Sequence, residues 1–160
     1  AFVIVYRLNK KKHRATAFSG EGARISGYRW NSAGVSLIYT ASSLSLAMLE
    51  ILVQGLEPEQ FKQYEGISAF VPDDSLEVAK VPKDWRSYPH PISTKRLGDD
   101  WIRSNRSLVL RVPSAVNPLE FNYLINPDHP DFATIELHKP FALEYDPRLL
   151  DLLRRLTEEG

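Results

Sequence analysis

Residues 35–54 read VSLIYTASSLSLAMLEILVQ, and this stretch carries the clearest structural signal in the chain. Its first part alternates between apolar and other side chains, which predicts a strand over residues 35–40 with Tyr39 on the apolar face. The serines that follow offer a helix cap, and the apolar run after them predicts a helix over residues 44–54. This helix is expected to be largely buried.

Glu50 is the one charged residue inside that apolar run. Ser45 and Gln54 lie about 180° apart on a helical wheel, so the predicted helix has no continuous polar face. An ionised carboxylate in such a setting costs several kcal/mol unless it is paired or hydrogen-bonded. A buried ion pair that only orients the helix would explain Glu50, and so would a side chain that reaches an edge. The pattern favours the functional interpretation over both.

Outside this stretch the chain supplies mostly short strands. The region from residue 57 to residue 106 carries five prolines and is predicted to be irregular. Because strands outnumber helices and do not alternate regularly with them, an α+β fold is favoured over a doubly wound sheet. The further elements predicted are strands over residues 2–6, 107–112, 121–125 and 132–137, and a helix over residues 147–156 with Asp146 as its cap.

Composition excludes several classes of function. The length of 160 residues suits one domain, here residues 1–160, and 20 basic residues balance 20 acidic ones. A net charge of zero argues against direct nucleic-acid binding and against a membrane-surface protein. The chain has no cysteine and its four histidines lack metal-ligand spacing, so no metal site is expected. No apolar run is long enough to span a bilayer, and a cytoplasmic location is expected.

Three further residues stand out on local grounds. Arg29 lies between Tyr28 and Trp30, where its planar fork could bind phosphate or carboxylate, although spacing alone favours cation–π packing. Tyr39 is by default a core tyrosine with a satisfied hydroxyl, and the alternative is a ring that stacks on a flat ligand. Ser114 follows a predicted strand, where a serine often forms a turn, and it lacks the surroundings of a hydrolase nucleophile.

Taken together, these stretches resemble the RES domain family. The family is named for an arginine, a glutamate and a serine, which correspond here to Arg29, Glu50 and Ser114. The resemblance runs from about residue 7 to residue 137. The stretches that carry it are residues 18–34 (FSGEGARISGYRWNSAG), 37–50 (LIYTASSLSLAMLE), 112–116 (VPSAV) and 122–131 (NYLINPDHPD).

The resemblance implies a fold similar to the NAD-using ADP-ribosyltransferases, an α+β core around a cleft. It also implies a toxin of a bacterial toxin–antitoxin system that cleaves NAD and releases nicotinamide, with NAD as substrate and no separate cofactor. The ADP-ribosyl group would pass to water, to inorganic phosphate or to a protein. The expected partner is an antitoxin with an Xre-like helix-turn-helix domain that blocks the cleft.

Within this framework the residues expected to be catalytic are Glu50, Arg29 and Ser114. Glu50 would stabilise the oxocarbenium-like ribose or orient its 2′-hydroxyl, as carboxylates do in glycoside hydrolysis. Arg29 would hold the diphosphate. A non-enzymatic interaction module, with Arg29 and Glu50 as a structural ion pair, remains the alternative.

NAD is expected to be bound by Arg29, Tyr39, Ser114, Asn122 and Arg7. Tyr39 would carry the nicotinamide ring, and Ser114 would bond the ribose or the amide. Asn122 would add a polar contact, and Arg7 a second positive charge near the phosphates. Tyr28 stands where the family often has a glycine, and its ring is expected to narrow the mouth of the pocket.

Overall fold

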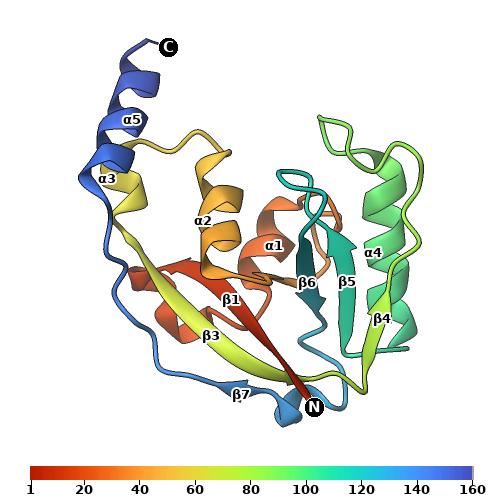
Figure 1. Ribbon diagram of the computed structural model, residues 1–160. Coiled ribbons are helices and arrows are strands. Elements are labelled where there is room, and N and C mark those ends of the chain that lie inside the picture. The colour runs from red at the N-terminus through yellow and green to blue at the C-terminus, as the bar shows by residue number, and fades with distance from the viewer. Residues whose placement is uncertain (160) are drawn as a thin grey trace.

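The computed structural model describes residues 1–159, and its framework is a curled sheet of seven strands (Figure 1). Their order across the sheet is β4-β5-β6-β2-β1-β3-β7. Neighbouring strands are antiparallel except β4 and β5, which are parallel. The strands are β1 (Phe2–Lys10), β2 (Ile38–Ala41), β3 (Tyr64–Pro72), β4 (Leu76–Val78), β5 (Val109–Pro113), β6 (Phe121–Ile125) and β7 (Glu136–Leu137).

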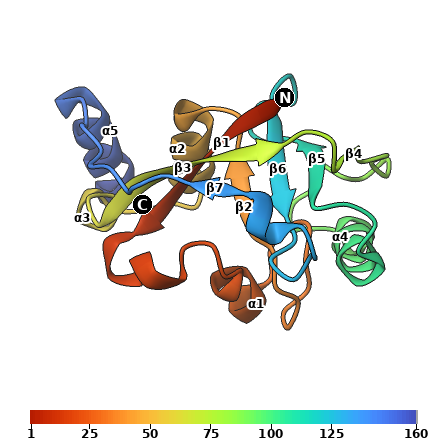
Figure 2. The ribbon, with the colours of Figure 1, turned by 90° about the horizontal axis from the view of Figure 1, so that it is seen from below.

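Helices flank this sheet at both ends. Figure 1 places α3 and α5 together at one end, whereas α4 lies beside β4 and β5 at the other. Figure 2 shows α1 and α4 on the side of the molecule away from the N-terminus. The helices are α1 (Glu21–Ser26), α2 (Leu44–Leu52), α3 (Pro58–Phe61), α4 (Ile92–Ser104) and α5 (Pro147–Glu158), with 3₁₀ turns η1 (Lys11–Thr16) and η2 (Phe132–Thr134).

Strand β1 pairs far more extensively with β3 than with β2. All nine residues of β1 pair with β3, from Phe2 opposite Pro72 to Lys10 opposite Tyr64. By contrast, β1 and β2 share one register pair within residues 1–159. Helix α2 contacts both β1 and β2, and Ser114 just beyond β5 and Asn122 of β6 bond to its Glu50.

Both faces of the sheet are covered by apolar clusters. Under α1 and α4, Trp30 and Trp101 pack with residues of β5 and β6. Under α2, α3 and α5, Leu46, Phe61 and Leu153 pack with β1. The opposite face holds a third cluster, built on alternate residues of β1, β3, β5 and β6. No helix within residues 1–159 has the length and hydropathy to cross a membrane.

The structure confirms the α+β class and most of the predicted elements. The first strand extends to Lys10, and the closing helix begins at Pro147 with Asp146 accepting a hydrogen bond from the Arg148 amide. The second strand is shorter than predicted and starts at Ile38. Ser43 caps α2 by accepting from the Leu46 amide.

The prediction of an irregular region over residues 57–106 is wrong. This region contains α3, the nine-residue strand β3, β4 and the thirteen-residue helix α4. The sequence of α4 lacks the apolar periodicity that predicts a helix, because only one of the four residues that it buries is a large apolar residue. The four are Thr94, Gly98, Asp99 and Trp101. In β3 the buried face begins with the charged residue Glu65, which pairs with Arg14, and the small residue Gly66 follows it, so the apolar alternation is broken there.

Two further expectations fail for identifiable reasons. Residues 132–137 form a 3₁₀ turn and the short β7 instead of one strand, because Thr134 bonds back to the Asp131 carbonyl through its amide and its hydroxyl. Helix α2 is not largely buried. It packs on β1 and β2 with one side only, so Leu49 is 44% exposed while Leu46 is fully buried.

The close packing of α4 on the loop before β2 gives the first testable prediction. A Cβ added to Gly98 would lie 1.6 Å from the Trp30 carbonyl oxygen. In an exposed helix, Gly→Ala stabilises by up to about 1 kcal/mol, but overpacking costs about 1–3 kcal/mol or more. We therefore expect Gly98→Ala to lower the free energy of unfolding, measured by urea denaturation.

Gly22 in α1 is the matched control, because nothing lies within 4 Å of the Cβ that Gly22→Ala would add. This variant should be as stable as the parent chain or slightly more stable. Equal stability of the two alanine variants would show that α4 does not press on the Trp30 backbone.

Candidate functional site

Glu50 lies at the centre of a hydrogen-bonded group that joins α2 to the ends of β5 and β6. Its Oε1 accepts hydrogen bonds from Ser114 Oγ at 2.6 Å and from Asn122 Nδ2 at 2.9 Å. Its Oε2 has no hydrogen-bond partner within residues 1–159, and the side chain is half-buried. One carboxylate oxygen is thus held in place and the other is available to a ligand.

The hydroxyl of Ser114 is fully engaged in hydrogen bonds that hold Glu50. Its side chain is fully buried just beyond β5, and its hydroxyl hydrogen is donated to Glu50. The same oxygen accepts from the amides of Val116 at 3.1 Å and Asn117 at 3.2 Å. The turn expected at this serine is therefore present. The hydroxyl fixes Glu50 in this structure, whereas the sequence suggested a contact with ribose or amide.

Asn122 approaches Glu50 from β6. It pairs in register with Ala41 on one side and Val112 on the other, so its amide is aimed across the strand ends at α2. Its Oδ1 is buried and has no hydrogen-bond partner. A buried acceptor without a donor is unusual and costly, which marks this position for a ligand donor.

Tyr39 anchors the loop that carries Arg29. Its hydroxyl donates to Asn31 Oδ1 at 2.7 Å and accepts from the Trp30 amide at 3.0 Å. Burial raises the pKa of Tyr39 above its ordinary value. The ring meets that of Tyr28 edge-on at 5.7 Å. The hydroxyl of Tyr39 is therefore fully hydrogen-bonded, as expected for a core tyrosine. The stacking of its ring on a flat ligand stays a prediction.

Arg29 is held by backbone carbonyls that the sequence did not point to. Its Nη1 donates to Trp85 O and to Ser87 O, both at 2.7 Å. Burial lowers its pKa, and the negative charge of Glu50 opposes this shift. No ion pair within residues 1–159 joins Arg29 to Glu50. The two residues are related only by the effect of the Glu50 charge on the pKa of Arg29.

Arg7 joins β1 to the neighbouring strand β2. Its Nη1 donates to Tyr39 O at 2.9 Å, while its Nε is buried without a partner. Burial lowers the pKa of Arg7, and the nearby ionisable groups that oppose this shift are Tyr28 and Tyr64. A buried cation without a carboxylate favours an anionic ligand.

The structure thus brings five of the six predicted residues into contact in two groups. Glu50, Ser114 and Asn122 form one, and Arg7 is bonded to Tyr39 in the other. Arg29 is linked to the first group by the field of Glu50 and to the second through the loop that Tyr39 anchors. The loop over residues 82–91 was missed because its contribution is made by carbonyls, which every residue carries.

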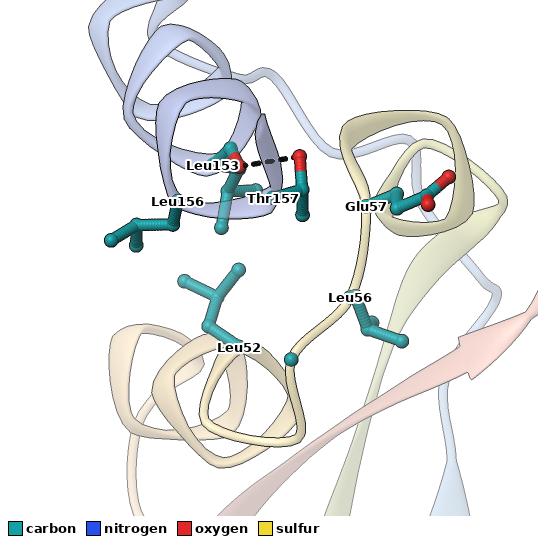
Figure 3. A pocket seen from close by; sticks show the side chains of 7 residues that line it. Leu52, Leu56, Glu57, Leu153, Leu156 and Thr157 are labelled. Atoms are coloured by element: carbon teal, nitrogen blue, oxygen red, sulfur yellow. Dashed lines mark hydrogen bonds between the residues drawn. The ribbon is translucent and has the colours of Figure 1, made fainter. Parts of the chain in front are cut away.

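Two hollows elsewhere on the surface contain none of the six residues. One, of about 330 Å³, lies between α2, α3 and α5, where Leu52, Leu153 and Leu156 face one another (Figure 3). The other, of about 350 Å³, lies between the segments of Phe18 and Phe132. No group of three metal-binding side chains occurs in the part of the chain that the structure describes.

Comparison with known proteins identifies the family. The model of the RES domain matches residues 4–148. The chain belongs to the RES domain family. A relative named Toxin Res, from Yersinia enterocolitica, is 37% identical over 151 residues, which is 92% of this chain and 99% of the relative. The Prs ADP-ribosylating toxin of a Sphingobium species is 37% identical over 150 residues, 88% and 91% of the two chains.

A solved structure supports the fold of this RES domain. A chain in the crystal structure of the M. tuberculosis MbcT–MbcA toxin–antitoxin complex superposes with a TM-score of 0.68. The match covers 97% of this chain and 90% of that chain, at 19% sequence identity. At this identity the likeness shows the shared architecture.

The geometry of Glu50 predicts how its variants fold. The amide oxygen in Glu50→Gln can still accept from Ser114 and Asn122, so we expect a free energy of unfolding within about 1 kcal/mol of the parent. Glu50→Leu leaves both donors without an acceptor and should cost about 1–3 kcal/mol. Urea denaturation measures both, and a Glu50→Leu variant as stable as Glu50→Gln would contradict the network.

Proposed function

We propose that this RES domain is the toxin of a toxin–antitoxin pair and cleaves NAD between nicotinamide and ribose. The observation that carries the proposal is the state of Glu50, whose Oε1 is fixed by Ser114 and Asn122 while its Oε2 has no partner among residues 1–159. The charge of Glu50 also acts on Arg29. The names of the relatives, Toxin Res and Prs ADP-ribosylating toxin, support it.

The proposed reaction begins when the bond between the ribose C1′ and the nicotinamide nitrogen breaks. Its electron pair stays with nicotinamide, which thereby loses its positive charge, while positive charge develops on the ribose. A carboxylate at about 4 Å stabilises such a charge by about 4 kcal/mol at an effective dielectric constant of about 20. The acceptor then attacks C1′ through an oxygen or nitrogen atom and releases a proton.

The free oxygen of Glu50 is the group assigned to this stabilisation, or to the 2′-hydroxyl of the same ribose. Ser114 and Asn122 act as positioning residues, because their hydrogen bonds fix the carboxylate before the substrate arrives. Preorganisation of this kind spares reorientation during the reaction. The unpartnered Oδ1 of Asn122 offers an acceptor for a ribose hydroxyl.

The two arginines are assigned to the diphosphate. Arg29 keeps Nε and Nη2 without partners among residues 1–159, and Arg7 keeps its buried Nε free. Neither is neutralised by a carboxylate contact, so both remain attractive to phosphate oxygens. Tyr39 is proposed to support the nicotinamide ring.

The relative that ADP-ribosylates favours a protein acceptor as the second candidate function. In that case the same bond breaks at the same Glu50, and the ADP-ribosyl group is attached to a protein side chain. The partner in either case is proposed to be an antitoxin of the Xre-like helix-turn-helix type. It would neutralise the domain by placing a carboxylate against Arg29, where the dinucleotide phosphates bind.

Kinetics separate the proposed roles of Glu50 and Arg29. Glu50→Gln removes the charge that stabilises the transition state, so kcat should fall by about 10²–10⁴-fold. Arg29→Ala removes a contact that is made before and during the reaction, so KM should rise more than kcat falls. Nicotinamide release is the assay, with folding confirmed by circular dichroism.

Glu59→Gln is the matched control, since Glu59 lies on the surface in a pair with Lys62. It should leave both constants unchanged. A folded Glu50→Gln variant with the turnover of the parent would remove Glu50 from the mechanism.

A further inference from the structure

The turn that carries Arg29 is closed by bonds between its first and last residues. Tyr28 and Asn31 form a β-bridge, in which the Tyr28 amide donates to Asn31 O at 3.1 Å. The same amide donates to Asn31 Oδ1 at 3.0 Å. Arg29 and Trp30 lie between the two paired residues, so the direction in which Arg29 leaves the backbone depends on the geometry of this turn. We refer to residues 28–31 as the Arg29 turn.

Lys95 holds both ends of the Arg29 turn from helix α4. Its Nζ donates to Tyr28 O at 2.8 Å and to Asn31 O at 3.2 Å. Hydrogen bonds from a charged donor are roughly twice as strong as neutral ones. Asn31 O has two donors, the Tyr28 amide and the Lys95 ammonium, and these use both of its lone pairs. The two carbonyls therefore cannot turn away from α4 without losing these bonds.

Local preferences disfavour a lysine at this position. Lys95 lies in the first turn of α4, where the positive end of the helix dipole repels a cation, and this turn has no acidic residue. None of the ion pairs among residues 1–159 includes Lys95. Its side chain is half-buried, so the ammonium exchanges part of its hydration for two backbone carbonyls. Residues that violate a local preference in this way are expected at functional sites.

Two neighbours of Lys95 on α4 complete the contact with this loop. Gly98 leaves room for the Trp30 carbonyl, because a Cβ at this position would lie 1.6 Å from that oxygen. Asp99 accepts from the amide and the hydroxyl of Ser32 at 2.9 and 2.6 Å. Gly98 thus admits the backbone of the turn, and Asp99 holds the residue that follows it. Of these three α4 residues, Lys95 is the one whose side chain bonds the turn itself.

We propose that Lys95 is a positioning residue for the cleavage of NAD, which acts by fixing the Arg29 turn and does not contact the substrate. The inference rests on the proposed function, because Arg29 is the residue assigned there to the substrate. With both ends of the turn held, the starting point of the Arg29 side chain is fixed before binding, and less conformational entropy is lost when the substrate arrives. Removal of the Lys95 hydrogen bonds should therefore weaken substrate binding only where Arg29 is present.

A double-mutant cycle measures whether Lys95 acts through Arg29. All chains carry Glu50→Gln to prevent turnover, the probe is ADP-ribose, and its affinity is measured by calorimetry. Lys95→Met keeps most of the stem but removes the donors, and it should weaken binding about tenfold. Lys95→Arg keeps charged donors and should weaken binding less than about threefold. In the Arg29→Ala background, Lys95→Met should change the affinity by less than about twofold.

Arg96→Met is the matched control, because Arg96 is the next residue of the same helix, is exposed and carries the same charge. It should leave the affinity unchanged. Equal losses from Lys95→Met with and without Arg29 would show that Lys95 acts independently of Arg29, and would overturn the proposal. A Lys95→Met chain that is less stable in urea but binds ADP-ribose as its parent does would also overturn it, since Lys95 would then support the fold alone.

Hydrogen exchange at the Tyr28 amide tests the Arg29 turn without any ligand. Lys95→Met should speed this exchange about tenfold and leave the amides of β3 unchanged. An unchanged rate at Tyr28 would overturn the role of Lys95, whatever the protein binds. Nicotinamide release by the chain with Glu50 intact is measured separately, so a failure of the proposed function is distinguishable from a failure of Lys95 to hold the turn.

Discussion

The packing of α4 on the loop that carries Arg29 is the constraint on which the rest of this structure depends. Gly98 leaves room for the Trp30 carbonyl, and Asp99 and Lys95 bond the backbone on either side of it. Tyr39 holds the same loop from β2. These contacts fasten the loop to both β2 and α4, and thereby fix the position of the Arg29 backbone between them.

Glu50, whose charge acts on Arg29, lies on a different element, the helix α2. Helix α2 is anchored on β1 and β2 by one face, and its carboxylate is tied to Ser114 and Asn122 at the ends of two other strands. Arg7 of β1 is bonded to the carbonyl of Tyr39 in β2, the residue that anchors the Arg29 loop. The charge of Glu50 thus acts on Arg29 without an ion pair between them in the described chain, which keeps both available to a charged substrate.

The sequence allowed the strand–helix unit and the site residues on it to be predicted, because an apolar run with one acid is a strong local signal. Arg29 and Ser114 were reached through the resemblance of several motifs in a fixed order. Helix α4 was not predicted, because its buried face carries small or polar residues such as Gly98 and Asp99. The partners of Arg29 were missed because carbonyls of the proline-rich loop leave no mark in the sequence.

We propose that this RES domain breaks the bond between nicotinamide and ribose in NAD. Mass analysis of the products tests it most directly, with purified protein and NAD incubated alone, with inorganic phosphate, and with a bacterial protein extract. We expect free nicotinamide together with an equal amount of one ADP-ribosyl product, whose mass identifies the acceptor. Intact NAD in all three incubations with folded protein would contradict it.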